Sequence, residues 1–517
     1  MPREIDHVEL LEAALRERAE QRLLWLRDPR RVQEEGPAFA RLLSVEGWES
    51  LEQAIRQRRY SARELTHLPE VWAELARERA RRSGRDWLGA WLQKEMAIGS
   101  TQRLPAVALS PLFEPIQTST APSGPTEALR ALGAALEPHV LRFLELREQA
   151  EYDAETQLAK LSRLMPRPSP AAPDALPPPP EAAAPQQRAL VSETATTVAV
   201  KVPSVQELAE TFLSRTDDAR REVVRWLVKH TELPGTESDL ARLVVGLRGF
   251  ALDGLARPDR RFFRLSAGAR KLGFERDMNA RMHGENAPGL LVPLPVSFAL
   301  GAPRDVRVLQ PDLEYGVLSD LSVAQGLGQG LALALISPAL GPLLSRPRGA
   351  SVSAAMGGLF VQLRAEAEYL RRVDGFERDA AEKAARLAAL WLLLRARLTA
   401  ALTLTWCGAA RSKEERIQQL KTAGERALGY EVPVGLLALT LLAEDTSQQQ
   451  FLGLHWGFEL HTLLRERFDH DFYLNPRLSE VLRGAAARGA DLDAAGMAAE
   501  LGAKGSQAVT RLFELLG

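Results

Sequence analysis

The chain has 517 residues, of which 45% are hydrophobic and 26% are charged, and its 66 basic and 67 acidic side chains give a formal net charge of −1. This length and composition predict a soluble globular protein of two or three domains or one large helical body, and the intermixed charges argue against a nucleic-acid partner. A single cysteine, Cys407, excludes an intrachain disulfide, and an acidic, amphipathic N-terminus predicts no signal peptide, so we expect a cytoplasmic protein.

Residues 1–164 form a predicted N-terminal helical region, because apolar residues recur there at spacings of three and four. The predicted helices are Val8–Leu26, Phe39–Val45, Trp48–Arg56 and Leu68–Met96. The pattern breaks over 99–125 and resumes from 126 to 164, with an interruption at Pro138. A long helix pair or a coiled-coil-like arm fits this second stretch.

Residues 165–188 contain proline at a density that neither a helix nor a central strand accepts. The segment is typical of an exposed polyproline-II-like linker or inserted loop. A docking peptide for a proline-binding module is the alternative. In either case, the segment 165–188 separates the N-terminal region from a second predicted domain, 189–517.

The second domain begins with a capping box, Ser204 to Glu207, which opens a helix ending at Arg215, and further helices are predicted over 217–230 and 237–255. The stretch 259–272 interleaves arginines with Phe262 and Phe263. We interpret its charges as one solvated helix face rather than a nucleic-acid surface. The arginines are Arg260, Arg261, Arg264 and Arg270.

A small β element near 290–310 is predicted from the short apolar runs Val292–Phe298 and Asp305–Leu309. A buried helix follows over 319–336, with Ser319 or Asp320 as its N-cap and Pro338 beyond its end. Its three glycines, Gly326, Gly328 and Gly330, cost helix stability and predict that another backbone packs closely. The uncharged run 321–345 could span a bilayer by length, but its prolines and glycines favour burial in a helical core, so no membrane partner is expected.

The later predicted helices cover 357–373, 378–406, 414–428, 433–443 and 451–468. The last contains His455, Glu459 and His461, which we treat as candidate cleft residues. His455 and Glu459 share a helix face at a spacing that could bind a metal, but two ligands make only a partial site.

Two windows carry a family resemblance: Gln325-Gly326-Leu327-Gly328-Gln329, and Ser351 to Ala355, in which Ala354 lies 25 positions after Gln329. They resemble the thimet oligopeptidase and oligoendopeptidase F group of HExxH zinc peptidases. That group has a helix of the type HE(F/L)GH, followed after about 25 residues by the glutamate that is the third zinc ligand. Gly328 matches the glycine of the family helix.

The resemblance implies a mainly α, multi-helical, metallopeptidase-like body with a central cleft, whose catalytic centre is lost. Gln325 and Gln329 replace the histidine ligands, Gly326 replaces the glutamate base and Ala354 replaces the third ligand. An amide binds zinc weakly, and neither glycine nor alanine has a donor. No metal or other cofactor is therefore expected.

The predicted function is that of a catalytically inactive pseudopeptidase that binds a peptide or a protein partner. Two alternatives remain open: an active hydrolase with a relocated site around His455, Glu459 and His461, and a helical scaffolding protein unrelated to peptidases.

Overall fold

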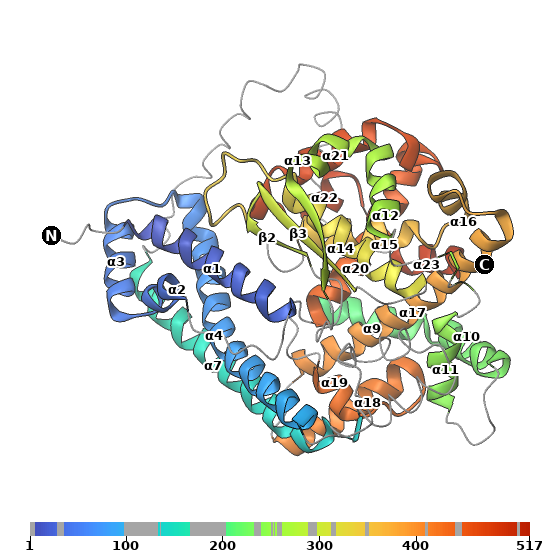
Figure 1. Ribbon diagram of the computed structural model, residues 1–517, viewed down its shortest axis with the longest axis horizontal. Helices are drawn as coiled ribbons and strands as arrows, with labels where there is room; N and C mark the ends of the chain where they lie inside the picture. Colours follow the sequence, from blue (N-terminus) through green and yellow to red (C-terminus); the bar gives the residue numbers. More distant parts are fainter. Residues whose placement is uncertain are drawn as a thin grey trace.

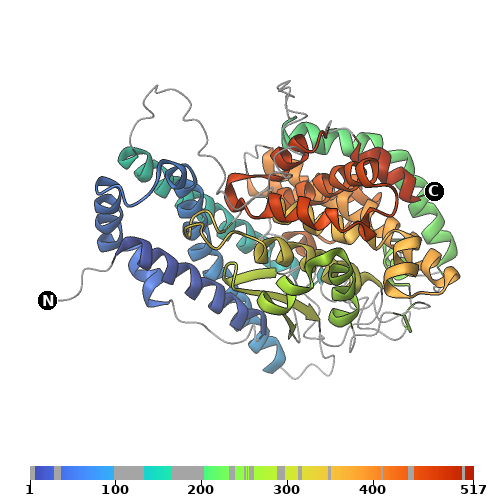
Figure 2. The ribbon, with the colours of Figure 1, turned by 90° about the horizontal axis from the view of Figure 1, so that it is seen from above.

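The computed structural model describes residues 6–27, 36–97, 133–134, 136–165, 203–231, 239–249, 252, 254–255, 261–287, 297–311, 317–346, 351–408, 412–439, 447–503 and 507–516. The protein is mainly α-helical with one small sheet, as the sequence predicts (Figure 1 and Figure 2). The predicted break at 99–125 and, Met165 apart, the proline-rich segment 165–188 lie outside the described residues. The division into 1–164 and 189–517 therefore stays a prediction.

The described N-terminal region consists of the helices α1 (His7–Arg27), α2 (Pro37–Leu42), α3 (Val45–Arg56), α4 (Ala62–Ala97) and α7 (Val140–Leu164), the last preceded by the 3-10 turn η1 (Glu137–His139). Helices α4 and α7 run side by side (Figure 1). Among the described residues of 126–164, α7 is the one long helix, so its partner is α4 and not, as the sequence predicts, a second helix of the same stretch. Leu11, Leu42 and Trp72, each fully buried, centre the hydrophobic cluster of helices α1–α4.

The rest of the chain is a helical body with the following elements: α9 (Val205–Arg215), α10 (Asp217–His230), α11 (Asp239–Arg248), α12 (Arg261–Ala269), the π-helical turn η4 (Arg270–Phe274), α13 (Glu275–Arg281), α14 (Val317–Ala334), α15 (Val352–Leu363), α16 (Ala367–Tyr369), the π-helical turn η5 (Leu370–Asp374), α17 (Arg378–Cys407), α18 (Lys413–Leu428), α19 (Val434–Leu439), α20 (Ser447–Phe468), η7 (Phe472–Leu474), α21 (Arg477–Ala486), η8 (Gly489–Asp491), α22 (Ala494–Glu500) and α23 (Ala508–Leu516). The predicted capping box is present, since the Ser204 and Glu207 side chains each accept a hydrogen bond from the other residue's backbone N–H.

The sheet has three strands, β1 (Met282–Ala287), β2 (Ser297–Gly301) and β3 (Asp305–Pro311), in the order β1-β3-β2. Strand β1 pairs parallel to β3, and β2 pairs antiparallel to it. Strand β1 was not expected, because its sequence MHGENA contains Gly and Asn and lacks apolar alternation. The sheet packs on α14: a Cβ atom on Gly330 would lie 2.9 Å from a Val308 methyl carbon.

Helix α17 is buried through its middle, as the sequence predicts. Of the described helices, α17 is the one whose length and apolarity would suffice to cross a bilayer, and 94% of its most apolar window is buried inside the protein, as in the core helix of a globular body. The other uncharged run, 321–345, is helical only as far as Ala334.

A buried ionic network fixes the start of α14 and corrects two expectations. Helix α14 begins at Val317, so Asp320 lies in its first turn and is not the N-cap. Asp320 pairs with Arg261 at 3.1 Å (Nε to Oδ1) and with Arg264, and Arg264 also reaches Asp374 at 3.1 Å. Arg261 is fully buried and Arg264 largely so. The prediction of a solvated arginine face on 259–272 is therefore wrong for these two residues. The carboxylates that compensate their buried charges, those of Asp320 and Asp374, come from distant parts of the chain.

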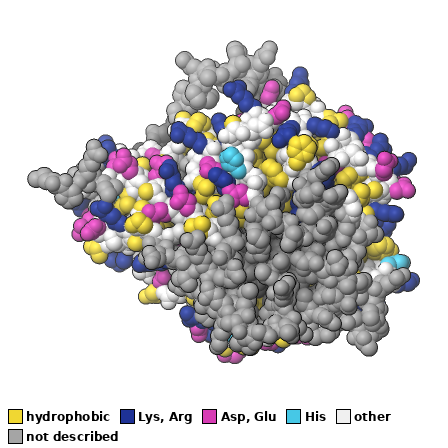
Figure 3. Space-filling model, viewed as in Figure 1, with side chains coloured by type: hydrophobic (Ala, Val, Ile, Leu, Met, Phe, Trp, Pro, Cys, Tyr) yellow, Lys and Arg dark blue, Asp and Glu magenta, His cyan; other side chains and the backbone are white. Residues whose placement is uncertain are grey.

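Surface charge is mixed on the face shown in Figure 3, where basic and acidic side chains alternate among apolar ones in the coloured part of the surface.

Candidate functional site

Helices α14 and α15 touch at the two windows that resemble the peptidase motif. A Cβ atom on Gly328 would lie 2.5 Å from the carbonyl oxygen of Met356 and 2.9 Å from Cβ of Phe360. Any larger residue at this position would push the helices apart. The glycine therefore serves close backbone packing, which is the role that the sequence predicts for it.

Gln325 and Gln329 both lie over Gly357 of α15. A Cβ atom on Gly357 would stand 2.6 Å from Cγ of Gln329 and 3.2 Å from Cγ of Gln325. Gln325 is buried and its Oε1 atom has no hydrogen-bond partner among the described residues, whereas Gln329 is partly exposed. The structure thus brings the two glutamines together against α15.

Two hydroxyls hold Gln329 in place. Ser353 of α15 donates a hydrogen bond from Oγ to the backbone oxygen of Gln329 at 3.0 Å, and Ser297 of β2 donates a longer one to its Oε1 atom at 3.4 Å. Gln329 therefore lies where α14, α15 and the edge strand β2 meet.

Ala354 lies one turn before Gly357 on α15, and its methyl group is directed toward α20. A Cβ atom on Gly453 of α20 would be 3.2 Å from Cβ of Ala354 and 3.0 Å from its carbonyl oxygen. Helix α15 thus packs between α14 and α20, and the three helices lie close together near the centre of Figure 1. The matched positions occupy neighbouring helices, but Ala354 does not point at the glutamine pair, and the expected central cleft beside them stays a prediction.

The chemistry available at these positions is that of two carboxamides, one residue without a side chain and one methyl group. None of them donates the imidazole nitrogen, thiolate or carboxylate that zinc prefers, and none accepts a proton from water near neutral pH.

The three candidate cleft residues of α20 take different roles. His455 is buried beside the rings of Phe451 and Trp456, whose centroids lie 5.9 and 5.2 Å from that of the imidazole. Burial lowers the pKa of His455 to about 4, so the ring is neutral at physiological pH.

Glu459 caps the N-terminus of α23. Its Oε1 atom accepts hydrogen bonds from the backbone N–H groups of Gln507 at 2.6 Å and Ala508 at 2.7 Å. A carboxylate at a helix N-terminus satisfies backbone donors that have no partner within the helix and interacts favourably with the helix dipole. Glu459 thus stabilises the terminal helix.

His461 contacts Glu366, a residue that no sequence pattern singles out. Its Nε2 atom lies 2.9 Å from Oε1 of Glu366, which also pairs with the buried Arg511 of α23. Burial works to raise the pKa of Glu366, but the close contact with the His461 ring and the charge of Arg511 outweigh it and hold that pKa below its usual range. Glu366 and Arg511 lie 145 residues apart, and no local spacing signals their contact.

The three residues of α20 therefore have different neighbours in this structure. Among the described ranges, no group of three His, Cys, Asp or Glu side chains is placed to share a metal ion.

No known family profile matches the chain, and no curated protein matches it. Among solved structures, the chain is similar to an oligoendopeptidase F from Bacillus anthracis, with a TM-score of 0.45 and 12% identity over 96% of this chain and 84% of that one. It is similar to metallocarboxypeptidase 1 of Trypanosoma cruzi, with a TM-score of 0.44 and 13% identity over 98% of both chains. It is also similar to an inhibitor complex of PZ peptidase A, with a TM-score of 0.48 and 9% identity over 91% of this chain and 83% of that one. All three are peptidases, and at these scores the likenesses assign the chain no family.

Proposed function

We propose that the chain is a non-catalytic relative of the HExxH zinc peptidases that binds a peptide or an extended protein segment near Gln329 and does not cleave it. The observation that carries the proposal is the contact between the two matched windows. Gln325 and Gln329 lie against α15 within one turn of Ala354, and Ser353 donates a hydrogen bond to the backbone of Gln329.

The residues at this contact support the loss of catalysis. A peptidase of the HExxH type needs metal ligands and a general base at these positions, since the metal activates the attacking water and the base removes its proton. Gln325, Gln329 and Ala354 supply no such ligand, and Gly326 supplies no base.

The neighbouring strand supports binding. Strand β2 lies at an edge of the sheet, and Ser297 of β2 reaches the partly exposed Gln329. Helix α1 also contacts β2, and we propose that an extended peptide adds to the part of this strand edge that α1 leaves open, through backbone hydrogen bonds that give affinity without chemistry.

The alternative of a relocated hydrolase around His455 requires Glu459 and His461 to leave the partners described above. No observation on these three residues favours it.

Two measurements on one purified sample test the proposal. Elemental analysis is expected to find zinc far below one equivalent, and a panel of fluorogenic peptides is expected to remain uncleaved with or without added zinc. Near-stoichiometric zinc, or cleavage that depends on a metal, would overturn it. The His455→Ala and Glu459→Ala variants then identify the source of any turnover.

Binding is tested with the same peptides by fluorescence anisotropy. A Gln329→Ala variant is expected to weaken binding at least several-fold, because it removes the carboxamide at the junction of α14, α15 and β2. Gln418→Ala is the matched control, since Gln418 is exposed on α18. Absence of binding to every peptide, or equal loss in both variants, contradicts a peptide-binding role at Gln329.

A further inference from the structure

A cavity of about 390 Å³ lies between α10 and the residues that follow α18, far in the chain from the matched windows. Its α10 side presents four basic residues around an apolar floor made by Val224 and Val228. The basic residues are Arg220, Arg221, Arg225 and Lys229. Cavities of this size accommodate small molecules. We call it the α10 cavity.

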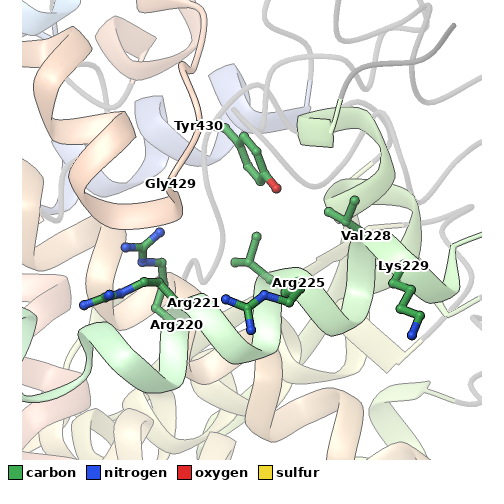
Figure 4. A pocket seen from close by; sticks show the side chains of 8 residues that line it. Arg220, Arg221, Arg225, Val228, Lys229, Gly429 and Tyr430 are labelled. Atoms are coloured by element: carbon green, nitrogen blue, oxygen red, sulfur yellow. The ribbon is translucent and has the colours of Figure 1, made fainter. Parts of the chain in front are cut away.

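The spacing along α10 explains why these cations gather. Arg221, Arg225 and Lys229 recur every four residues, so they share one helix face, and Val224 and Val228 lie beside them. In Figure 4, Arg225 lies between Arg221 and Lys229 along α10, and the phenol of Tyr430 points across the cavity toward this helix.

The lining of the α10 cavity contributes four positive charges and no negative one among the described residues. Asp217 contacts three guanidinium groups at once, those of Arg220 at 2.9 Å, Arg221 at 2.9 Å and the buried Arg397 at 3.0 Å. One carboxylate cannot neutralise three cations.

Two of the lining cations add to this excess. Arg225 and Lys229 are exposed and pair with no carboxylate among the described residues, whereas Arg221 has a second partner, Asp218, at 3.1 Å. A concave surface with charges of one sign concentrates the electric potential and attracts ions of the opposite sign.

The buried Arg397 is a further cation beside Asp217. Burial lowers the pKa of its guanidinium to about 10, and the positive charges of Arg220 and Arg426 lower it while Asp217 raises it. Cations therefore crowd this end of α10 from both sides.

Asp217 and Gly429, the residue that follows α18, hold the guanidinium of Arg220 in place. Asp217 accepts hydrogen bonds from its Nε and Nη2 atoms at 3.3 and 2.9 Å, and its Nη1 atom lies against Gly429. Gly429 has φ 85°, and a side chain there would overlap Arg220. Glycine at this position thus ends α18 and makes room for a guanidinium at the cavity wall.

We propose that the α10 cavity binds a small polyanion that carries at least two phosphate or carboxylate groups. Planar guanidinium groups bind both oxyanions through paired hydrogen bonds, which suits the exposed Arg225, and the ammonium group of Lys229 adds a second positive charge. The valine floor accommodates an uncharged linker between the anionic groups. This site is independent of the peptide-binding role, because it shares no residue with the α14–α15 contact.

Isothermal titration calorimetry of the full chain with inorganic pyrophosphate and, separately, with citrate tests the proposal at constant ionic strength. We expect saturable binding with one site per chain for at least one of them. Pyrophosphate alone assigns a phosphate ligand, citrate alone assigns a carboxylate ligand, and both assign a general polyanion site. If neither pyrophosphate nor citrate binds saturably, the proposal is overturned.

A matched pair of variants locates the site. Arg225→Gln combined with Lys229→Gln is expected to weaken binding at least tenfold, because it removes the two cations that have no carboxylate partner among the described residues. Lys383→Gln combined with Arg467→Gln changes the net charge equally at exposed positions elsewhere and is expected to change affinity less than twofold. Equal weakening by both pairs would show attraction by net charge only and would overturn the site.

Discussion

The helix contacts around α15 depend on single glycines, and this makes them sensitive to one added methyl group. A Cβ atom on Gly358 would overlap the carbonyl oxygen of Gly453 and lie 3.0 Å from Cα of Gly457. Those atoms belong to the backbone of α20 and cannot rotate away.

Gly358→Ala is therefore expected to destabilise the protein by roughly 1–3 kcal/mol or more, although alanine is the better helix former. Gly484→Ala is the control, because Gly484 also lies within a helix but a Cβ atom there meets nothing within 4 Å. That change is expected to stabilise the protein by up to about 1 kcal/mol. Urea unfolding of both variants decides the matter, and a neutral Gly358→Ala would contradict the close packing of α15 on α20.

At this scale the sequence predicts what local spacing determines. It placed Gln325 and Gln329 on one face and gave Gly328 its packing role, since both follow from helical periodicity. It could not place Arg261 inside the protein, because the carboxylate that compensates its charge, Asp320, lies 59 residues away. The four-residue repeat of cations on α10 likewise indicates no site by itself, because only the fold shows that a cavity faces them.

The element that carries the matched window, α14, is anchored by charge at its N-terminal end. Burial works to raise the pKa of Asp320, but the charges of Arg264, Arg261 and Arg364 outweigh it, so that pKa lies below its usual value. Asp320→Asn is expected to cost about 3–5 kcal/mol at pH 7, because buried arginines lose their partner.

The lowered pKa of Asp320 makes the stability of the protein depend on pH, with a definite sign. A carboxyl group whose pKa is lowered by folding stabilises the protein above its unfolded pKa of about 3.9 and loses that contribution as the pH falls through the folded value. The stability difference between the natural protein and Asp320→Asn should thus be constant from pH 7 to 5 and shrink below about pH 4. Asp471→Asn is the control: Asp471 pairs with Arg372 at 3.4 Å on the surface and should cost less than about 1 kcal/mol. A difference that grows on acidification would contradict the anchoring role.

The sequence predicts where helices form better than it predicts which elements pack against one another. Helices α9, α10 and α17 lie within one residue of the predicted bounds, because capping residues and long apolar repeats mark them. Strand β1 was missed, since its pairing partner β3 supplies the stability that its own residues lack. The packing of α15 between α14 and α20 has no local signal other than glycine.

At the scale of the whole molecule, the two regions separated by the proline-rich segment share a hydrophobic core. Val140, Phe143 and Leu144 of α7 belong to the same buried cluster as the inner faces of α17 and α20. A Cβ atom on Gly435 of α19 would lie 2.6 Å from Cβ of Leu136. The linker predicted from composition therefore joins parts that are already in contact.

Cleavage of the chain within 165–188, at an inserted protease site, is consequently expected to leave the two fragments bound to each other, so that they co-elute in size-exclusion chromatography. Phe143→Asp should separate them after cleavage, because Phe143 is fully buried and a carboxylate in its place loses roughly 1.5–3 kcal/mol of apolar burial and adds a desolvated charge. Leu141→Asp is the matched control two residues earlier on the same helix: its side chain is 46% exposed, and the fragments should stay together. Fragments that part without any substitution would show that α7 contributes little to holding the regions together, and the N-terminal helices would then be a separate unit tethered by the proline-rich segment.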